Sequence, residues 1–208
     1  MARLIDMGIK ELNSLLLEMS ALSEKAVATS IQAYKEGQKG TEVKDMSNRL
    51  ADLHRQVSDL TMEVIARYQP VASDLRFLKS CFEISYGFFR YGRYARDIAE
   101  VLEMFGDLSN CDNSAVVKTA LKTEEMIRMS ADAFARRDVE LARRILAMDD
   151  VVDDSYRKNL RRVIQEKENL KCAISTTLIM RYLERIADHA TYIGESVEYI
   201  VTGVEPAH

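Results

Sequence analysis

The sequence is poor in residues that break helices and in cysteines that could cross-link a small fold through disulfides. Its 208 residues include no tryptophan, 2 prolines, 8 glycines and 3 cysteines. So few breakers exclude a collagen-like repeat and a turn-rich β-sandwich, and they favour long helices. Because Cys81, Cys111 and Cys172 are odd in number and lack C-x-x-C spacing, we expect neither a disulfide framework nor a thiolate zinc site.

Long apolar runs and an excess of positive charge are also missing. The longest apolar-leaning run, Cys172 to Met180, is too short to cross a bilayer, and the first residues lack the apolar stretch of a secretory signal. Lys and Arg total 29 against 33 Asp and Glu, a net charge of −4, so no broad cationic field attracts nucleic acid. We therefore expect a cytoplasmic protein that binds no nucleic acid and meets membranes only through partners.

What the sequence does contain is helical periodicity. Apolar residues, 47% of the chain, recur at helical spacing in six stretches between short breaks. The expected helices cover residues 9–36, 43–68, 70–105, 114–137, 139–165 and 170–201. The strongest break is 106–113, rich in capping and turn residues. We place a domain boundary there, between residues 1–107 and 108–208.

The two halves also resemble each other. Ala33-Tyr34 matches Ala133-Phe134, and residues 95–100 align with 190–195. We therefore predict an all-α fold made of two tandem three-helix bundles related by internal duplication. The last helix carries a clear apolar seam with alternating steps of four and three residues. That seam consists of Ile179, Leu183, Ile186, Ala190, Ile193, Val197 and Ile200.

Four acidic residues in the second half have the spacing of a metal site. Asp149 and Asp153 lie four residues apart on one expected helix, and Glu184 and Asp188 lie four apart on the next, away from its seam and outside the core. If the two helices pack antiparallel, the carboxylates can converge. Oxygen ligands of this kind suit Mg, Ca or Mn, or iron in a carboxylate-rich cluster.

Two simpler interpretations of these acids remain open. They could form an ordinary solvated helix face, or Arg181 and Arg185 could neutralise Glu184 in ion pairs. His189 points about 100° away from Asp188, so we expect it at the helix surface or in a contact between subunits. For the remaining histidines, His54 and His208, we expect surface roles.

No arrangement of residues indicates catalysis. There is no Ser-His-Asp or Cys-His pattern, no phosphate-cradling glycine loop and no inward-facing Glu-x-x-His of the di-iron type, so we do not expect an enzyme. The segment 88–96 mixes arginines with aromatic residues. We interpret the aromatic side chains as core packing and the arginines as surface ion-pair partners.

Two stretches, residues 69–76 (QPVASDLR) and 181–190 (RYLERIADHA), closely resemble the PhoU family of phosphate-signalling proteins. The resemblance implies a cytoplasmic regulator that forms homodimers or higher oligomers and binds metal through paired E(D)-x-x-x-D motifs. It further implies that the chain restrains the ATPase or permease of a Pst-type phosphate ABC transporter and couples it to a sensor histidine kinase. The second-half motif falls on Glu184 and Asp188, facing Asp149 and Asp153, and leaves iron, zinc, magnesium or manganese open as the metal.

The first half departs from the family pattern. Phe89 and Arg93 occupy the positions equivalent to Glu184 and Asp188, and Ser47 and Ala51 stand where the preceding helix should carry acids. We therefore predict one metal site per chain, with Arg93 paired to an acid or an anionic partner. The leading hypothesis is a regulator of phosphate homeostasis that acts by protein contact. The alternatives are a helical carboxylate-metal enzyme or metal-storage protein, and an inert dimeric scaffold.

Overall fold

The structure, a computed structural model, describes residues 4–108, 110–166 and 169–205, and this part of the chain is helical without strands. The all-α prediction is confirmed. The helices are α1 (Leu4–Glu36), α2 (Glu42–Tyr68), α3 (Ala72–Phe105), α4 (Ser114–Arg136), α5 (Val139–Gln165) and α6 (Leu170–Thr202). No helix within these residues is long and apolar enough to cross a membrane.

The breaks in the sequence explain where the helices begin and end. Gly106 and Gly203 follow α3 and α6 with φ angles of 65° and 75°, a conformation that glycine adopts without strain. Asp138 caps α5, because its side chain accepts a hydrogen bond from the backbone N–H of Leu141 at 2.9 Å. The first helix is longer than expected, since it begins at Leu4 instead of Ile9.

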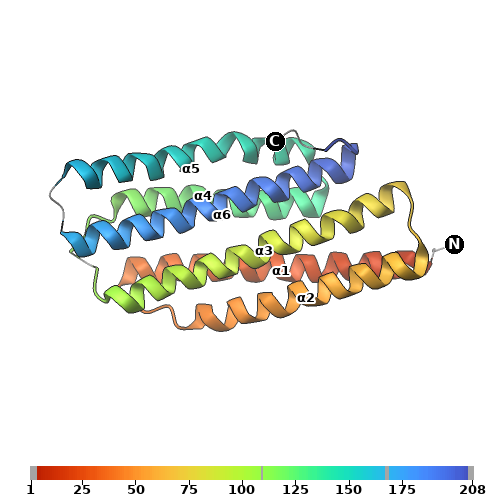
Figure 1. Ribbon diagram of the computed structural model, residues 1–208, viewed down its shortest axis with the longest axis horizontal. Coiled ribbons are helices and arrows are strands. Elements are labelled where there is room, and N and C mark those ends of the chain that lie inside the picture. Colours follow the sequence, from red (N-terminus) through yellow and green to blue (C-terminus); the bar gives the residue numbers. More distant parts are fainter. Residues whose placement is uncertain (1–3, 109, 167–168, 206–208) are drawn as a thin grey trace.

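The helices form an elongated bundle in which the two halves lie side by side (Figure 1). In each half the three helices pack on one another, and α3 and α6 also pack together along the middle of the molecule. Helices α5 and α6 follow one another in the chain and run antiparallel. The predicted boundary between 1–107 and 108–208 falls in the connection from α3 to α4 and stays a prediction.

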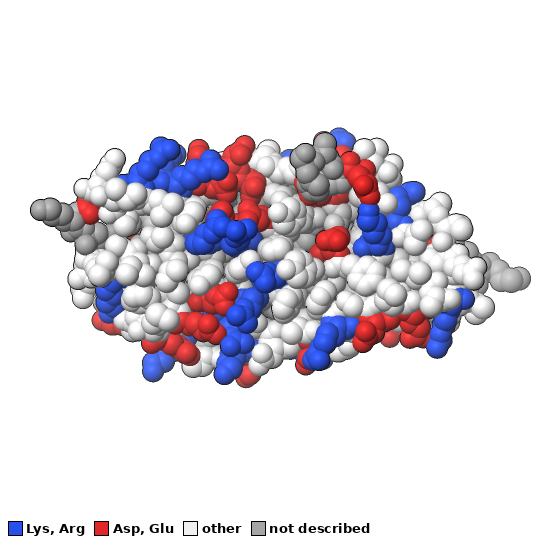
Figure 2. All heavy atoms as spheres, in the orientation of Figure 1, with Lys and Arg blue, Asp and Glu red and all other residues white. Residues whose placement is uncertain are grey.

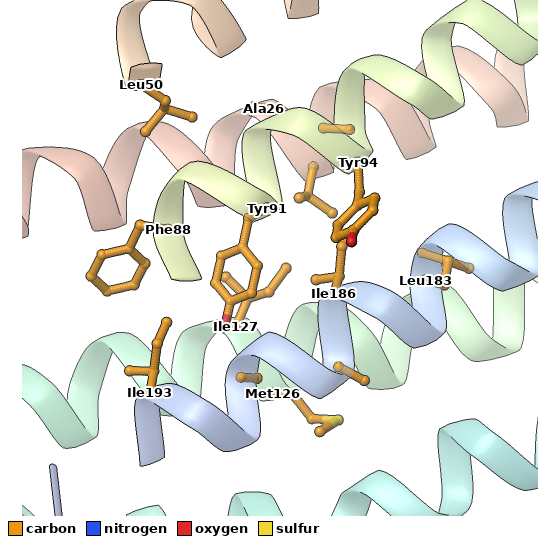
Figure 3. Packing of buried hydrophobic residues seen from close by; sticks show 14 of the residues in the cluster. Ala26, Leu50, Phe88, Tyr91, Tyr94, Met126, Ile127, Leu183, Ile186 and Ile193 are labelled. Carbon is orange, nitrogen blue, oxygen red and sulfur yellow. The ribbon is translucent and has the colours of Figure 1, made fainter. Parts of the chain in front are cut away.

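One continuous apolar core joins the halves. Figure 3 shows Phe88, Tyr91 and Tyr94 of α3 pointing into the space lined by Ile186 and Ile193 of α6. These side chains are buried. The seam predicted for α6 is confirmed from residue 179 to residue 197, and only its last member is partly exposed. The shared core explains why α3 and α6 act as the central pair.

The expectation that the cysteines form no disulfide is wrong. Cys111, in the connection between the halves, is bonded to Cys172 in the first turn of α6, and their Cα atoms lie 5.4 Å apart. Sequence spacing could not show the pair, because 61 residues separate the two cysteines and only the return of α6 along the bundle brings them together. The third cysteine, Cys81, is a buried free thiol.

Candidate metal centre

The four acids singled out in the sequence lie where α5 and α6 pack together. One carboxylate oxygen from each of Asp149, Asp153 and Asp188 lies within 4.8 Å of the others. Glu184 lies one turn before Asp188 on α6 and contributes to the same negative field, since its charge acts on Asp149. In Figure 2, acidic side chains gather over α5 and α6, bordered by basic ones. We call these four residues the acidic cluster.

The cluster is less exposed than the sequence suggested. Glu184 was expected outside the core, but its relative exposure is only 8%, whereas Asp149, Asp153 and Asp188 are half-buried. The physical reason is that α3, α4 and α5 all pack against α6, so the buried arc of α6 is wider than its apolar seam. The solvated-face interpretation therefore fails for Glu184.

Several oxygens of the acidic cluster are buried without a hydrogen-bond partner, namely Asp149 Oδ1, Asp153 Oδ1 and Glu184 Oε2. A buried, unsatisfied polar atom is unfavourable by roughly 1–3 kcal/mol, more when it is charged. A cation coordinated by these oxygens would remove that cost. Because the donors are all carboxylate oxygens, they fit a hard divalent cation better than a thiolate-seeking metal.

Arginines neutralise part of the acidic cluster. Arg157 Nη2 lies 3.1 Å from Asp153 Oδ2, and Arg185 Nη1 lies 3.2 Å from Asp188 Oδ2. Glu184 Oε1 accepts a hydrogen bond from Arg181. Arg185 Nε also lies 3.8 Å from Glu184 Oε2, an ion pair too long for a hydrogen bond. Asp153 Oδ1 and Glu184 Oε2 therefore stay without a hydrogen-bond partner. The ion-pair interpretation is therefore correct in part and leaves room for a metal.

The electrostatics of the cluster centre on Asp149. Burial, followed by the negative charges of Asp188, Asp153 and Asp150, raises the pKa of this carboxyl from 3.8 to about 6. Burial also raises the pKa of Glu184 and of Asp188, although nearby arginines oppose the effect. The metal-free cluster thus resists full ionisation, and a bound cation would supply the positive charge that stabilises the ionised form.

The equivalent place in the first half is built differently. The ring of Phe89 stacks on His54 with centroids 5.5 Å apart, and Arg93 Nε lies 3.3 Å from Asp97 Oδ1. Arg93 is therefore paired with an acid, one of the two outcomes expected. His54 was expected at the surface, yet it is partly buried and its Nδ1 lies 2.9 Å from Ser85 Oγ. Among the described residues, only the second half groups three or more acids as metal ligands.

His189 corrects another expectation. It was expected at the surface or between subunits, but it is buried within the chain between α3 and α6. Its ring contacts those of Tyr86, Tyr94 and Tyr192, with centroids 5.5–5.9 Å apart. Burial, followed by the charges of Arg90 and Arg185, lowers the pKa of His189 to about 4, so the ring is neutral near pH 7.

A sequence signal for this aromatic group did exist. Tyr182, His189 and Tyr192 recur on α6 at steps of seven and three, and Tyr86 and Tyr94 recur on α3 at a step of eight, so each set occupies one helix face. The expected role of the segment 88–96 is confirmed for its aromatic residues, which pack in the core or onto it, and for Arg93 and Arg96, which pair with acids. It is wrong for Arg90, which is partly buried, donates a hydrogen bond to Tyr94 and lies over the ring of that tyrosine. What sequence reasoning missed was that these faces meet across the two halves.

Comparison with known proteins agrees with this architecture. The family model "PhoU domain" matches residues 16–102 and 116–197. The chain is 29% identical over 208 residues to the "Phosphate-specific transport system accessory protein PhoU homolog" of Pseudomonas putida, covering 96% of this chain and 81% of that protein. A protein of the same description from Synechocystis sp. is 30% identical over 207 residues, covering 95% of this chain and 91% of its own.

Solved structures have the same fold. The crystal structure of PhoU from Pseudomonas aeruginosa superposes with a TM-score of 0.89 at 27% identity, over 96% of this chain and 99% of the other. The PhoU phosphate transport system regulatory protein from Streptococcus pneumoniae gives a TM-score of 0.90 at 19% identity, over 98% and 100% of the two chains. With the family match extending through both halves, the chain belongs to the PhoU family.

Proposed function

We propose that this chain is an accessory regulator of phosphate transport that acts by contact with other proteins. Its support is the family match through both halves, together with relatives described as accessory proteins of the phosphate-specific transport system. Long, rigid helices provide a broad surface for such contacts. The partner we favour is the ATPase or permease of a phosphate ABC transporter, reached from the cytoplasm, and the second partner is a sensor histidine kinase.

We further propose that the acidic cluster binds a divalent cation that assists this contact. Asp149, Asp153 and Asp188 would supply ligand oxygens, with Glu184 at the edge. The buried oxygens that lack hydrogen-bond partners carry this part of the proposal. The bound cation would link α5 to α6 and remove the repulsion among the acids, so that the two helices present one fixed surface.

A binding assay tests both parts. Purified protein is mixed with the transporter ATPase, with manganese or with a chelator, and the complex is measured by pull-down. Asp150 is an exposed acid on the same helix, so Asp150→Asn serves as the control. In the presence of metal, the wild type and Asp150→Asn should bind the ATPase, while Asp149→Asn and the wild type in chelator should bind it less.

Equal binding by all four samples would refute the metal's role, and absence of binding to ATPase, permease and kinase alike would refute the docking role. The expected homodimer stays a prediction that light scattering can test.

A further inference from the structure

A pocket separate from the acidic cluster lies between α3 and α6. The beginning of α3, the end of α6 and Glu205 just after it line an open pocket of about 470 Å³. Its lining residues are Lys79, Ser80, Glu83, Tyr192, Glu195, Ser196, Tyr199 and Glu205. None of these belongs to the acidic cluster. Figure 2 shows acidic and basic side chains next to one another near the end of α6, where α3 runs beside it in Figure 1.

The charge of this pocket favours a cation. Three glutamates and one lysine line it, which gives a formal net charge of −2. Two tyrosine rings form part of the wall, and their faces attract cations through the ring quadrupole. Ser80 and Ser196 add hydroxyl oxygens that can accept hydrogen bonds. A ligand that combines positive charge with N–H donors therefore matches the lining.

The protein already places an ammonium group in this pocket. Lys79 Nζ lies 4.7 Å from the centroid of the Tyr199 ring and donates a hydrogen bond to Glu205. Glu205 raises the pKa of Lys79, first through this bond, and Glu83 contributes in the same direction. The side chains of Lys79 and Glu205 are more than half exposed, so the contact can open without unfolding the bundle.

The rings and the spread of the acids distinguish this pocket from a metal site. Among the described residues, its glutamates do not form a group close enough to share one metal ion, unlike the acidic cluster. The ring of Tyr192 is held edge-on against buried His189, with centroids 5.5 Å apart. A fixed ring beside dispersed carboxylates suits an organic cation with an alkyl stem, because the stem can pack on the ring while the ammonium meets the acids.

We propose that this pocket binds a primary alkylammonium group. In the absence of a ligand the side chain of Lys79 occupies the pocket, and the ligand displaces it. The same chemistry can come from a free polyamine or from a lysine side chain of a partner protein. Because the pocket shares no residue with the acidic cluster, the proposal stands or fails separately from the proposed function.

The test is a titration of the full chain followed by NMR. The probes are spermidine and a lysine blocked at both its amino and carboxyl ends, with the same lysine acetylated on Nζ as an uncharged control. Both charged probes should shift the amide signals around Tyr192 and Tyr199, and added salt should weaken binding. Spermidine binding about tenfold tighter than the blocked lysine identifies a free polyamine as the source, and similar affinities identify a partner's side chain. Either result supports an alkylammonium site.

Variants separate the pocket from non-specific attraction. Lys79→Ala should tighten binding about fivefold, because the pocket is then always free. Glu83→Gln and Tyr199→Leu, each combined with Lys79→Ala, should weaken it again. The matched control is Lys122→Ala, since Lys122 pairs with exposed Glu125 on α4, and it should leave binding unchanged.

Three results would overturn the proposal. The first is no saturable shift with the Lys79→Ala variant at millimolar probe. The second is equal affinity for the acetylated lysine and the charged lysine. The third is an affinity that stays the same when Glu83→Gln or Tyr199→Leu is added to Lys79→Ala. Circular dichroism of each variant confirms that the helices are intact, so loss of binding can be assigned to the pocket.

Discussion

Replacing Asp149 with asparagine should stabilise the metal-free protein, although it removes a charged residue from a candidate functional site. In the folded chain the pKa of Asp149 rises from 3.8 to about 6, so the folded state holds a proton that the unfolded state has already released. Stability therefore falls as the pH rises from about 4 to about 6, and the loss is complete above that range. Asparagine carries no charge and avoids this loss.

The size of the effect follows from the shift. The full shift corresponds to about 3 kcal/mol, and because the side chain is only half-buried, solvent screening reduces this to about 1–2 kcal/mol. For a chain of this length the melting temperature should rise by about 2–8 °C near neutral pH. Below pH 4 the variant and the wild type should be equally stable, because Asp149 is then protonated in both states.

The assay is thermal and urea unfolding in a chelator across this pH range. Asp132→Asn is the matched control, because Asp132 is exposed and lies 3.6 Å from Arg136 on α4, and its effect should stay within about 0.5 kcal/mol. With saturating divalent metal, the order should reverse and the wild type should be the more stable protein. A variant less stable than the wild type in chelator near neutral pH would refute the reasoning.

Three further changes test the packing. Gly87→Ala places a Cβ 2.8 Å from Ile193 Cδ1, so the buried Ile193 side chain or the two helices must shift, and urea unfolding should show a loss of about 1–3 kcal/mol; no loss would contradict the close packing. Cys172→Ser should lower stability by up to about 4 kcal/mol, and only the wild type should respond to a reductant. Tyr91→Phe removes a buried hydrogen bond to Ser130 at 3.1 Å and should lower the unfolding free energy by about 1 kcal/mol.

Much of the fold could be predicted because it depends on local pattern. Apolar periodicity and the breaks at residues 37–40, 69–70 and 106–113 located all the helices that the structure describes, to within a few residues. Periodicity also identified the seam of α6. It could not show how wide the buried arc of α6 is, since that depends on three neighbouring helices, and Glu184 was therefore placed outside the core.

The candidate site was predictable only where it depends on i, i+4 spacing within one helix. Asp149 and Asp153 lie four residues apart on α5, and Glu184 and Asp188 lie four apart on α6, so the antiparallel packing of the two helices was enough to bring the pairs together. His189 and the Cys111–Cys172 bond depend on contacts between segments far apart in sequence. The spacing of residues within one helix does not show which residue of a distant segment will contact them.

The central claim is that the acidic cluster binds a divalent cation, and calorimetric titration of chelator-treated protein with manganese tests it most directly. The account predicts one saturable site per chain in the wild type and in Asp150→Asn, and loss of that site when Asp149 and Glu184 are both replaced with alanine while the helical content is unchanged. Undiminished binding by the double variant, or no saturable binding by the wild type, would contradict it.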